Sequence, residues 1–151
     1  MSVAKIVILN WNGAEHLRRF LPSVVAAAPA GVEVMVADNG STDDSLGVLA
    51  TEFPSVGVLR LEANYGFAGG YNRALEQVRA DYYLLLNSDI ETPEGWLAPI
   101  LDVLEREPDV AVVSPKLISW TDRTKFEYAG ASGGFIDFLG YPFCRGRILK
   151  P

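Results

Sequence analysis

Hydrophobic and polar positions follow two alternating periods along the chain. Five short apolar runs rich in β-branched residues predict strands: residues 5–9, 33–37, 56–61, 82–86 and 110–113. Four segments with helical spacing or helix-start signals predict helices: from Ala14 onward, from residue 41 to about Glu52, and over 69–79 and 96–107. This alternation predicts an α/β fold with a mostly parallel sheet, right-handed crossovers and helices on both faces.

Local signals add detail to these elements. Pro22 lies inside the first predicted helix, where it predicts a kink or a break because proline has no N–H to donate. Ser41-Thr42-Asp43-Asp44 reads as a hydroxyl cap followed by acids, and Thr92-Pro93-Glu94 as a second helix start. Residues 82–86 are apolar throughout, which predicts a strand covered on both faces.

The alternation ends after about Lys116. The following residues are rich in glycine and aromatic side chains and show no helical period, so we expect irregular loops and short edge strands. The pattern divides the chain into an α/β core, residues 1–115, and an irregular region of the same domain, residues 116–151.

Composition removes several classes of function. The net charge of −6 and pI of about 4.7 disfavour a nucleic-acid partner, although a small anionic substrate stays open. A single cysteine, Cys144, excludes an intrachain disulfide and a thiolate zinc site. The single histidine, His16, lies beside Arg18 and Arg19 in a predicted helix, which favours a solvated position over a catalytic one. No apolar run approaches the ~20 residues of a membrane span, and no signal peptide opens the chain.

Polar residues gather where the predicted strands end. They are Asn10-Trp11-Asn12, Asp38-Asn39, Asn64-Tyr65-Gly66 and Asn87-Ser88-Asp89. Each group alone is also typical of a tight turn. Ligands of open parallel sheets bind beyond the carboxyl ends of the strands, so the groups together favour a site for a polar ligand.

The group at residues 87–89 is the most specific. Mg²⁺ and Mn²⁺ prefer oxygen ligands and commonly take one or two carboxylates plus substrate phosphates. Asp89 is a candidate ligand for such an ion, held against a diphosphate. Asn87 offers only a neutral oxygen, and Glu91 is either a second carboxylate of the site or a solvated residue.

Four segments in order resemble the motifs of family 2 glycosyltransferases. They are Ile6-Val7-Ile8-Leu9-Asn10-Trp11-Asn12, Val36-Ala37-Asp38-Asn39-Gly40-Ser41-Thr42-Asp43, Asn64-Tyr65-Gly66-Phe67-Ala68-Gly69-Gly70-Tyr71-Asn72-Arg73-Ala74 and Leu84-Leu85-Leu86-Asn87-Ser88-Asp89. The last resembles the family's D-x-D metal motif, with Asn in the first position. This Asn-first form and the run from Phe67 to Asn72 look most like the rhamnosyltransferase-type branch.

The resemblance implies a GT-A (Rossmann-like) fold and inverting transfer of a sugar from a nucleoside-diphosphate sugar to a glycan or lipid-linked acceptor. It implies that Asp38 bonds the base, that Asn10 and Trp11 flank the base and ribose, and that Asp89 holds Mn²⁺ or Mg²⁺. By the same resemblance, the donor pocket also includes Asn39, Gly66, Asn72, Asn87 and Ser88. The family often has Arg where this chain has Tyr71.

Inversion requires a general base for the acceptor hydroxyl. The family's base lies downstream of the metal motif beside adjacent acids, and the late acids Glu127 and Asp137 have no such context. We therefore expect an N-terminal portion, truncated after the nucleotide-binding half, with residues 116–151 as the incomplete start of the acceptor side. The expected location is cytoplasmic, at the inner face of the membrane and associated with its surface.

Three other classes bear on this interpretation. A nicotinamide-dependent dehydrogenase and a P-loop NTPase need glycine motifs that are absent here. A sugar-phosphate nucleotidyltransferase needs a basic loop after the first strand, where only Arg18 and Arg19 are near. A non-catalytic nucleotide-sugar-binding module stays open as an alternative.

Overall fold

The computed structural model describes residues 4–127 and 133–144. The chain divides into two compact units, Met1–Leu97 and Ala98–Pro151, and each is described by itself. The predicted domain division near residue 115 stays a prediction.

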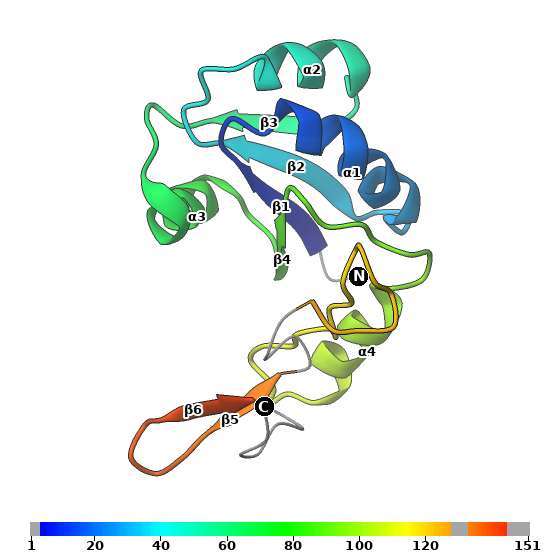
Figure 1. The fold of residues 1–151 in the computed structure, drawn as a ribbon, viewed down its shortest axis with the longest axis vertical. Helices are drawn as coiled ribbons and strands as arrows, with labels where there is room; N and C mark the ends of the chain where they lie inside the picture. The colour runs from blue at the N-terminus through cyan, green and yellow to red at the C-terminus, as the bar shows by residue number, and fades with distance from the viewer. Residues whose placement is uncertain (1–3, 128–132, 145–151) are drawn as a thin grey trace. The chain divides into compact units, whose positions relative to one another are not determined.

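Unit 1 is built on a parallel sheet of four strands in the order β3-β2-β1-β4 (Figure 1). The strands are β1 (Ala4–Asn10), β2 (Glu33–Asp38), β3 (Gly57–Arg60) and β4 (Tyr82–Asn87). The helices between them are α1 (Ala14–Ala27), α2 (Ser45–Glu52) and α3 (Gly66–Gln77). The predicted alternation of strands and helices and the parallel sheet are confirmed for this unit.

Side chains of successive strand residues point to opposite faces of the sheet, and both faces of β1 are covered. On one face Val7 packs with Ala37 and with residues of α3, including Tyr71 and Ala74. Ile6 and Ile8 point the other way, and both are fully buried. Figure 1 shows α1 and α2 on one side of the sheet and α3 on the other, as predicted.

Two predicted details of the helices, a break at Pro22 and a cap at Ser41, are wrong, whereas a kink at Pro22 stays a prediction. Helix α1 continues through Pro22 without a break, because the buried residues Leu21 and Val24 on either side anchor both turns. Helix α2 begins at Ser45, and neither Ser41 nor Thr42 caps it. Their polar groups are engaged instead with Asn12 on the loop after β1. These hydrogen bonds to Asn12, which is distant in sequence, use the polar groups that the local pattern predicted to cap α2.

The fourth strand is also not covered on both faces. β4 lies at an edge of the sheet, and its residues alternate between half-buried and exposed, with Leu85 52% exposed. The apolar run alone did not distinguish an edge strand from a central one. Its polar end is nevertheless placed as predicted, since Leu9 of β1 pairs with Asn87.

Unit 2 contains α4 (Ala98–Arg106) and an antiparallel hairpin of β5 (Gly134–Ile136) and β6 (Pro142–Cys144). The helix begins at Ala98 rather than Trp96, with Pro99 in its first turn where no N–H is required. Thr92 is buried in unit 1 and its N–H donates to Ser23 Oγ at 3.2 Å, so it starts no helix.

No strand forms over residues 110–113, and the predicted fifth strand is wrong. Val112 is 83% exposed there, so the apolar run is not part of a sheet. An isolated bridge between Ile118 and Phe126 and the short hairpin confirm the predicted loops and short strands after Lys116. Within residues 4–127 and 133–144, no helix combines the length and the apolar character needed to cross a membrane.

Candidate functional site

The carboxyl ends of β1 and β2 meet in a buried pair of polar side chains. Asn10 and Asp38 are opposite each other in the strand register, and both are almost fully buried. Asn10 Nδ2 donates to Asp38 Oδ2 at 3.1 Å, and Ser41 N donates to Asp38 Oδ1 at 3.0 Å. A buried carboxylate needs such donors, because without them its desolvation is very costly. Both residues therefore lie at the edge of the sheet where β1 and β2 end, and their role in binding a ligand stays a prediction.

Ser41 and Asn12 extend this pair into a network that the sequence analysis did not assign. Ser41 Oγ accepts hydrogen bonds from Asn10 Nδ2 at 3.2 Å and from the Asn12 backbone N–H at 2.9 Å. Asn12 Oδ1 in turn accepts the N–H groups of Thr42 at 2.7 Å and Asp43 at 3.3 Å. Asn12 has a φ of 50°, a left-handed conformation that Asn tolerates better than most residues. The Asn-Gly pair at positions 12 and 13 was the available sequence signal.

Asn39 organises a second set of bonds to the loop before α3. Its Nδ2 donates to Asn64 Oδ1 at 3.0 Å and to the Gly66 carbonyl at 3.1 Å, while its Oδ1 accepts Tyr65 N–H at 3.0 Å. Gly40, with a φ of 74°, lies so close to this loop that a Cβ there would be 2.7 Å from the Ala63 carbonyl carbon. The predicted residues Asn39 and Gly66 are therefore brought together.

One carboxylate, that of Asp43, holds the N-termini of two helices. Its Oδ2 accepts Ala14 N–H at 3.0 Å and its Oδ1 accepts Ser45 N–H at 3.0 Å. Partial burial acts to raise the pKa of Asp43, but the hydrogen bonds from Ser45 and Ala14 outweigh it, and the pKa is lowered overall. The first N–H groups of a helix have no partner within the helix, so Asp43 satisfies donors of both α1 and α2.

Tyr71 joins α3 to the end of β4. The residue is 4% exposed, and its hydroxyl donates to the Leu86 carbonyl at 2.9 Å. Burial raises the pKa of this phenol, so it stays neutral at physiological pH. At position 71, where the family often has Arg, this chain has a buried tyrosine. Its hydroxyl holds the end of β4 just before residues 87–89.

The close approach of Gly13 links the β1 end to the β4 end. A Cβ at Gly13 would collide with Asn10 Oδ1 and would lie 3.6 Å from Ser88 Oγ. Asn10 Oδ1 is buried and has no hydrogen-bond partner among the described residues. Ser88 therefore lies near the Asn10–Asp38 pair.

Other predicted site residues are exposed around this cluster. Trp11 is 56% exposed, so its ring is not part of the hydrophobic core. Asn72, Asn87 and Asp89 are also exposed, and the structure gives no direct contact between them and the buried pair. His16 is exposed on α1 and stacks on Phe20 at 6.2 Å between ring centroids, as expected of a solvated residue.

The donor set at the end of β4 fits a metal ion shared with a substrate. The Asp89 carboxylate is exposed, and no hydrogen bond or ion pair to it is found in the described part of the chain. No three His, Cys, Asp or Glu side chains within that part are grouped to hold an ion alone. Asp89 would therefore hold Mg²⁺ or Mn²⁺ only together with neutral oxygens and substrate phosphates, which is a common arrangement for Mg²⁺.

Helix α3 carries a cation, Arg73, to which the sequence analysis gave no role. The Arg73 guanidinium lies 3.9 Å from the centre of the Tyr65 ring, in a cation–π contact. Both residues line a cavity of about 220 Å³, together with Arg60 of β3. The Arg73 charge therefore lies next to the loop that Asn39 holds.

The family model described as "Glycosyl transferase family 2" matches residues 5–143 of this chain. The chain belongs to glycosyl transferase family 2. The membership predicted from the four motifs is therefore confirmed.

Curated relatives include a rhamnosyltransferase, in keeping with the predicted branch. N-acetylglucosaminyl-diphospho-decaprenol L-rhamnosyltransferase of Mycobacterium tuberculosis is 29% identical over 125 residues, which are 76% of this chain and 41% of the relative. Undecaprenyl-phosphate 4-deoxy-4-formamido-L-arabinose transferase of Sodalis glossinidius is 33% identical over 113 residues, 70% of this chain and 34% of the relative. The chain thus spans less than half the length of these relatives.

Solved structures confirm the predicted GT-A fold. Staphylococcus aureus TarS 1-349 in complex with UDP-GlcNAc has a TM-score of 0.61 at 21% identity and matches over 79% of this chain and 38% of that one. The mannosyltransferase PcManGT of Pyrobaculum calidifontis, in complex with GDP-Man and Mn²⁺, has a TM-score of 0.61 at 18% identity, over 72% and 34% of the two chains.

Proposed function

We propose that this chain forms the donor-binding side of an inverting glycosyltransferase that uses a nucleoside-diphosphate sugar. One observation carries the proposal. The ends of β1, β2 and β4 bring the buried Asn10–Asp38 pair beside Ser88, with Trp11 exposed next to it. A ligand with a flat base and a charged diphosphate matches an aromatic face and a row of polar groups at one sheet edge.

In this proposal the base lies against the ends of β1 and β2. Each Asp38 oxygen has one donor in the structure and a free lone pair, so it is able to accept a base N–H as well. Trp11 offers its exposed ring for stacking. Asn39 and Gly66 fix the loop beside the ribose, and Asn72 and Asn87 present amides to the donor from α3 and β4.

Asp89 and Ser88 are the residues that would hold a divalent ion with the donor diphosphate. Bound there, the ion would neutralise the charge that develops on the leaving diphosphate. Asp89 supplies one full negative charge, so the ion and the diphosphate should bind together rather than separately. This cooperation distinguishes the proposal from a preformed metal site.

The acceptor side is proposed from the relatives. The relatives from M. tuberculosis and S. glossinidius are named for a lipid diphosphate and a lipid phosphate, and we propose a glycan or lipid-linked acceptor for the whole protein. We further propose cytoplasmic action at the inner face of the membrane.

The surroundings of Arg18 bear on the nucleotidyltransferase alternative. A nucleotidyltransferase would need Arg18 for its triphosphate, but Arg18 is engaged with Glu15, Asp44 and Glu52 at 3.0, 3.6 and 2.8 Å. This observation disfavours that class. A non-catalytic binding module would use the same donor site, and it differs only in lacking transfer.

Isothermal titration of the chain with UDP, GDP and dTDP, each with and without Mn²⁺, tests the proposal. We expect one nucleotide to bind and its affinity to fall at least about tenfold without Mn²⁺ or in Asp89→Ala. Asp109→Ala removes another exposed acid, in unit 2, and is the matched control. If no nucleoside diphosphate binds, the proposed function is wrong.

A further inference from the structure

Residues 116–151 differ in charge from the rest of the chain. They hold six basic and three acidic residues, a net charge of +3, whereas residues 1–115 hold seven and sixteen, a net charge of −9. A basic segment in an acidic protein indicates an interaction with anions that the whole-chain charge conceals.

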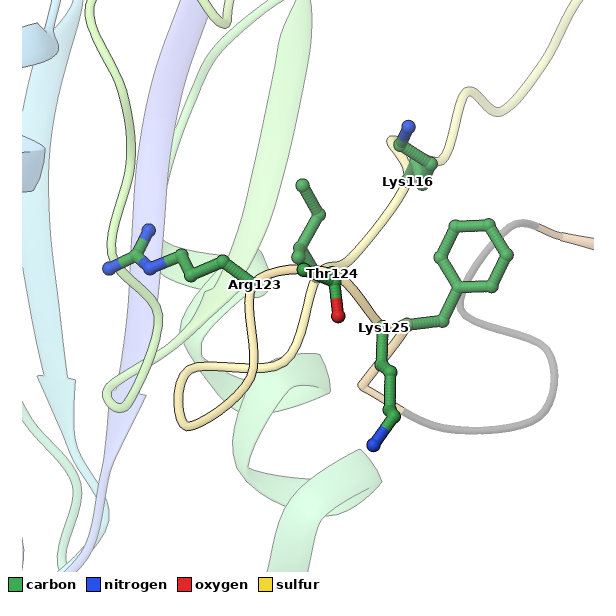
Figure 2. A pocket seen from close by; sticks show the side chains of 6 residues that line it. Lys116, Arg123, Thr124 and Lys125 are labelled. Carbon is green, nitrogen blue, oxygen red and sulfur yellow. The ribbon is translucent and has the colours of Figure 1, made fainter.

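Three of these cations surround one hollow of unit 2. Lys116, Arg123 and Lys125 line a cavity of about 330 Å³ with Ile118, Thr124 and Phe126. Figure 2 shows that the charged ends of Lys116, Arg123 and Lys125 point away from one another. One small anion therefore cannot contact all three cations, whereas a surface that carries many phosphate groups can contact each of them.

Two of the three acids of this region, Asp122 and Asp137, form hydrogen bonds within its turns. Asp122 Oδ1 accepts the N–H and the hydroxyl of Thr124 at 3.1 and 2.6 Å. Asp137 Oδ1 accepts the N–H groups of Leu139 and Tyr141 at 2.9 and 3.0 Å. Asp122 Oδ2 also forms an ion pair with Lys125 Nζ at 2.9 Å, but both side chains stay largely exposed to water, so this pair is weak and the region keeps its net positive charge.

Apolar side chains are exposed beside the cations. Ile118 and Phe126 are about half exposed, and Lys116 Nζ lies 5.8 Å from the Phe126 ring centre. Arg123 lies 4.8 Å from the ring centre of Trp120. Basic side chains next to half-exposed aromatic rings suit the membrane–water interface, where the ring enters the headgroup region and the cation faces phosphate.

The β5–β6 hairpin of the same unit exposes further apolar side chains. Phe138 at its tip is 94% exposed and Ile136 is 73% exposed. Phe135, Leu139 and Tyr141 are exposed as well. An apolar cluster of this kind needs a partner that is itself apolar, since isolated exposed residues are common but clusters are not.

We propose that the basic–aromatic surface (Lys116, Ile118, Trp120, Arg123, Lys125 and Phe126) and the hairpin dock on an anionic phospholipid bilayer. A bilayer supplies both chemistries, phosphates for the diverging cations and an apolar interior for the aromatic rings. A nucleic acid would leave the hairpin tip exposed. The proposal does not depend on donor binding, because none of its residues lies in the strand-end cluster.

Vesicle co-sedimentation of the chain tests this surface. We expect binding to vesicles of phosphatidylglycerol and phosphatidylcholine in equal parts, no binding to phosphatidylcholine alone, and release by added salt. The triple variant Lys116→Gln, Arg123→Gln, Lys125→Gln should bind at least about tenfold more weakly. Arg19→Gln, Arg60→Gln, Arg79→Gln removes the same charge from exposed positions of unit 1 and should bind like the unchanged chain.

A second variant tests the apolar part by a different route. Phe138→Ser changes a fully solvated side chain, so the fold should persist by circular dichroism while vesicle binding falls.

The proposal is overturned if the chain does not bind anionic vesicles, or if the control triple variant loses as much binding as the test triple variant. It is also overturned if inorganic phosphate releases the chain far better than chloride at equal ionic strength, which would indicate a discrete phosphate pocket. Self-association without vesicles, abolished by Phe138→Ser, would indicate a second copy as the partner and would equally overturn it.

Discussion

Two aspartates show how differently the two units use the same side chain. Asp38 in unit 1 is 2% exposed and accepts from Asn10, which is 28 residues away in sequence. Asp137 in unit 2 is exposed, and its carboxylate accepts from residues two and four positions further on. The first bond exists only in the folded sheet, whereas the second can form in an isolated turn.

The comparison shows in which unit the polar side chains contribute to global stability. Around Asp38, Asn39 and Asp43, each carboxylate or amide joins segments far apart in the chain, so losing one leaves buried donors without acceptors. Around Asp122 and Asp137, water replaces a lost bond at small cost. Variants in unit 1 should therefore change global stability, and those in unit 2 should change local order and surface binding.

The largest effect is expected for Asn10→Asp. It places a second carboxylate against that of Asp38 in a buried site and should cost about 3–5 kcal/mol of unfolding free energy at pH 7. The two acids would share a proton, so the folded-state pKa of one is raised and the loss should shrink as the pH falls toward it. Urea unfolding at several pH values measures this. Asn12→Asp, exposed and already accepting backbone N–H groups, should cost far less. Equal losses of unfolding free energy in the two variants would mean that burial of the Asn10–Asp38 pair does not raise the cost of an added carboxylate.

Gly40→Ala should have the next largest effect. The Cβ would meet the backbone of residue 63 at 2.7 Å, and the φ of 74° is unfavourable for alanine, so we expect a loss of about 2–4 kcal/mol. Gly31→Ala is the matched control, because its φ is 88° but nothing lies within 4 Å of the new Cβ. It should lose only about 1–2 kcal/mol by thermal unfolding. A Gly40 variant no less stable than the control would disprove the close approach of the two loops.

Asp43→Ala should cost about 1 kcal/mol at pH 7, since its carboxylate caps two helices but is partly hydrated. The folded-state pKa of Asp43 lies below its ordinary value of 3.8, so this stabilisation is present above pH 4 and is lost as the pH falls through the lowered pKa. Thermal unfolding from pH 7 to pH 2 should show the two stabilities converging. Asp44→Ala, which loses only a 3.6 Å pair with Arg18, should change stability by less than about 0.5 kcal/mol.

Asp137→Ala should have the smallest effect. The N–H groups of Leu139 and Tyr141 lose their acceptor but are exposed to water, so global stability should change by less than about 0.5 kcal/mol. Hydrogen exchange should accelerate at these two amides alone. Faster exchange in β1 or β2 would show that the hairpin supports unit 1, and would contradict the expectation that polar contacts of unit 2 affect only local order.

Much of unit 1 was predictable because its signals are local. Asn10, Asp38, Asn39 and Ser88 end apolar runs, and the parallel order of the strands brings those ends to one edge. The partners of these groups were not predictable. Ser41 looked like a cap, yet its hydroxyl bonds Asn10 and Asn12, about 30 residues earlier.

By itself, the sequence determined the α/β alternation, the parallel sheet, the family and the polar residues at its edge, because periodicity and motif order are written in consecutive residues. The tertiary structure alone decided that β4 is an edge strand, that residues 110–113 form no strand, and that one carboxylate, Asp43, holds two helices. These features depend on which residues, distant in sequence, cover a face of the sheet or accept a hydrogen bond from a helix N-terminus. No local window of the chain contains that information.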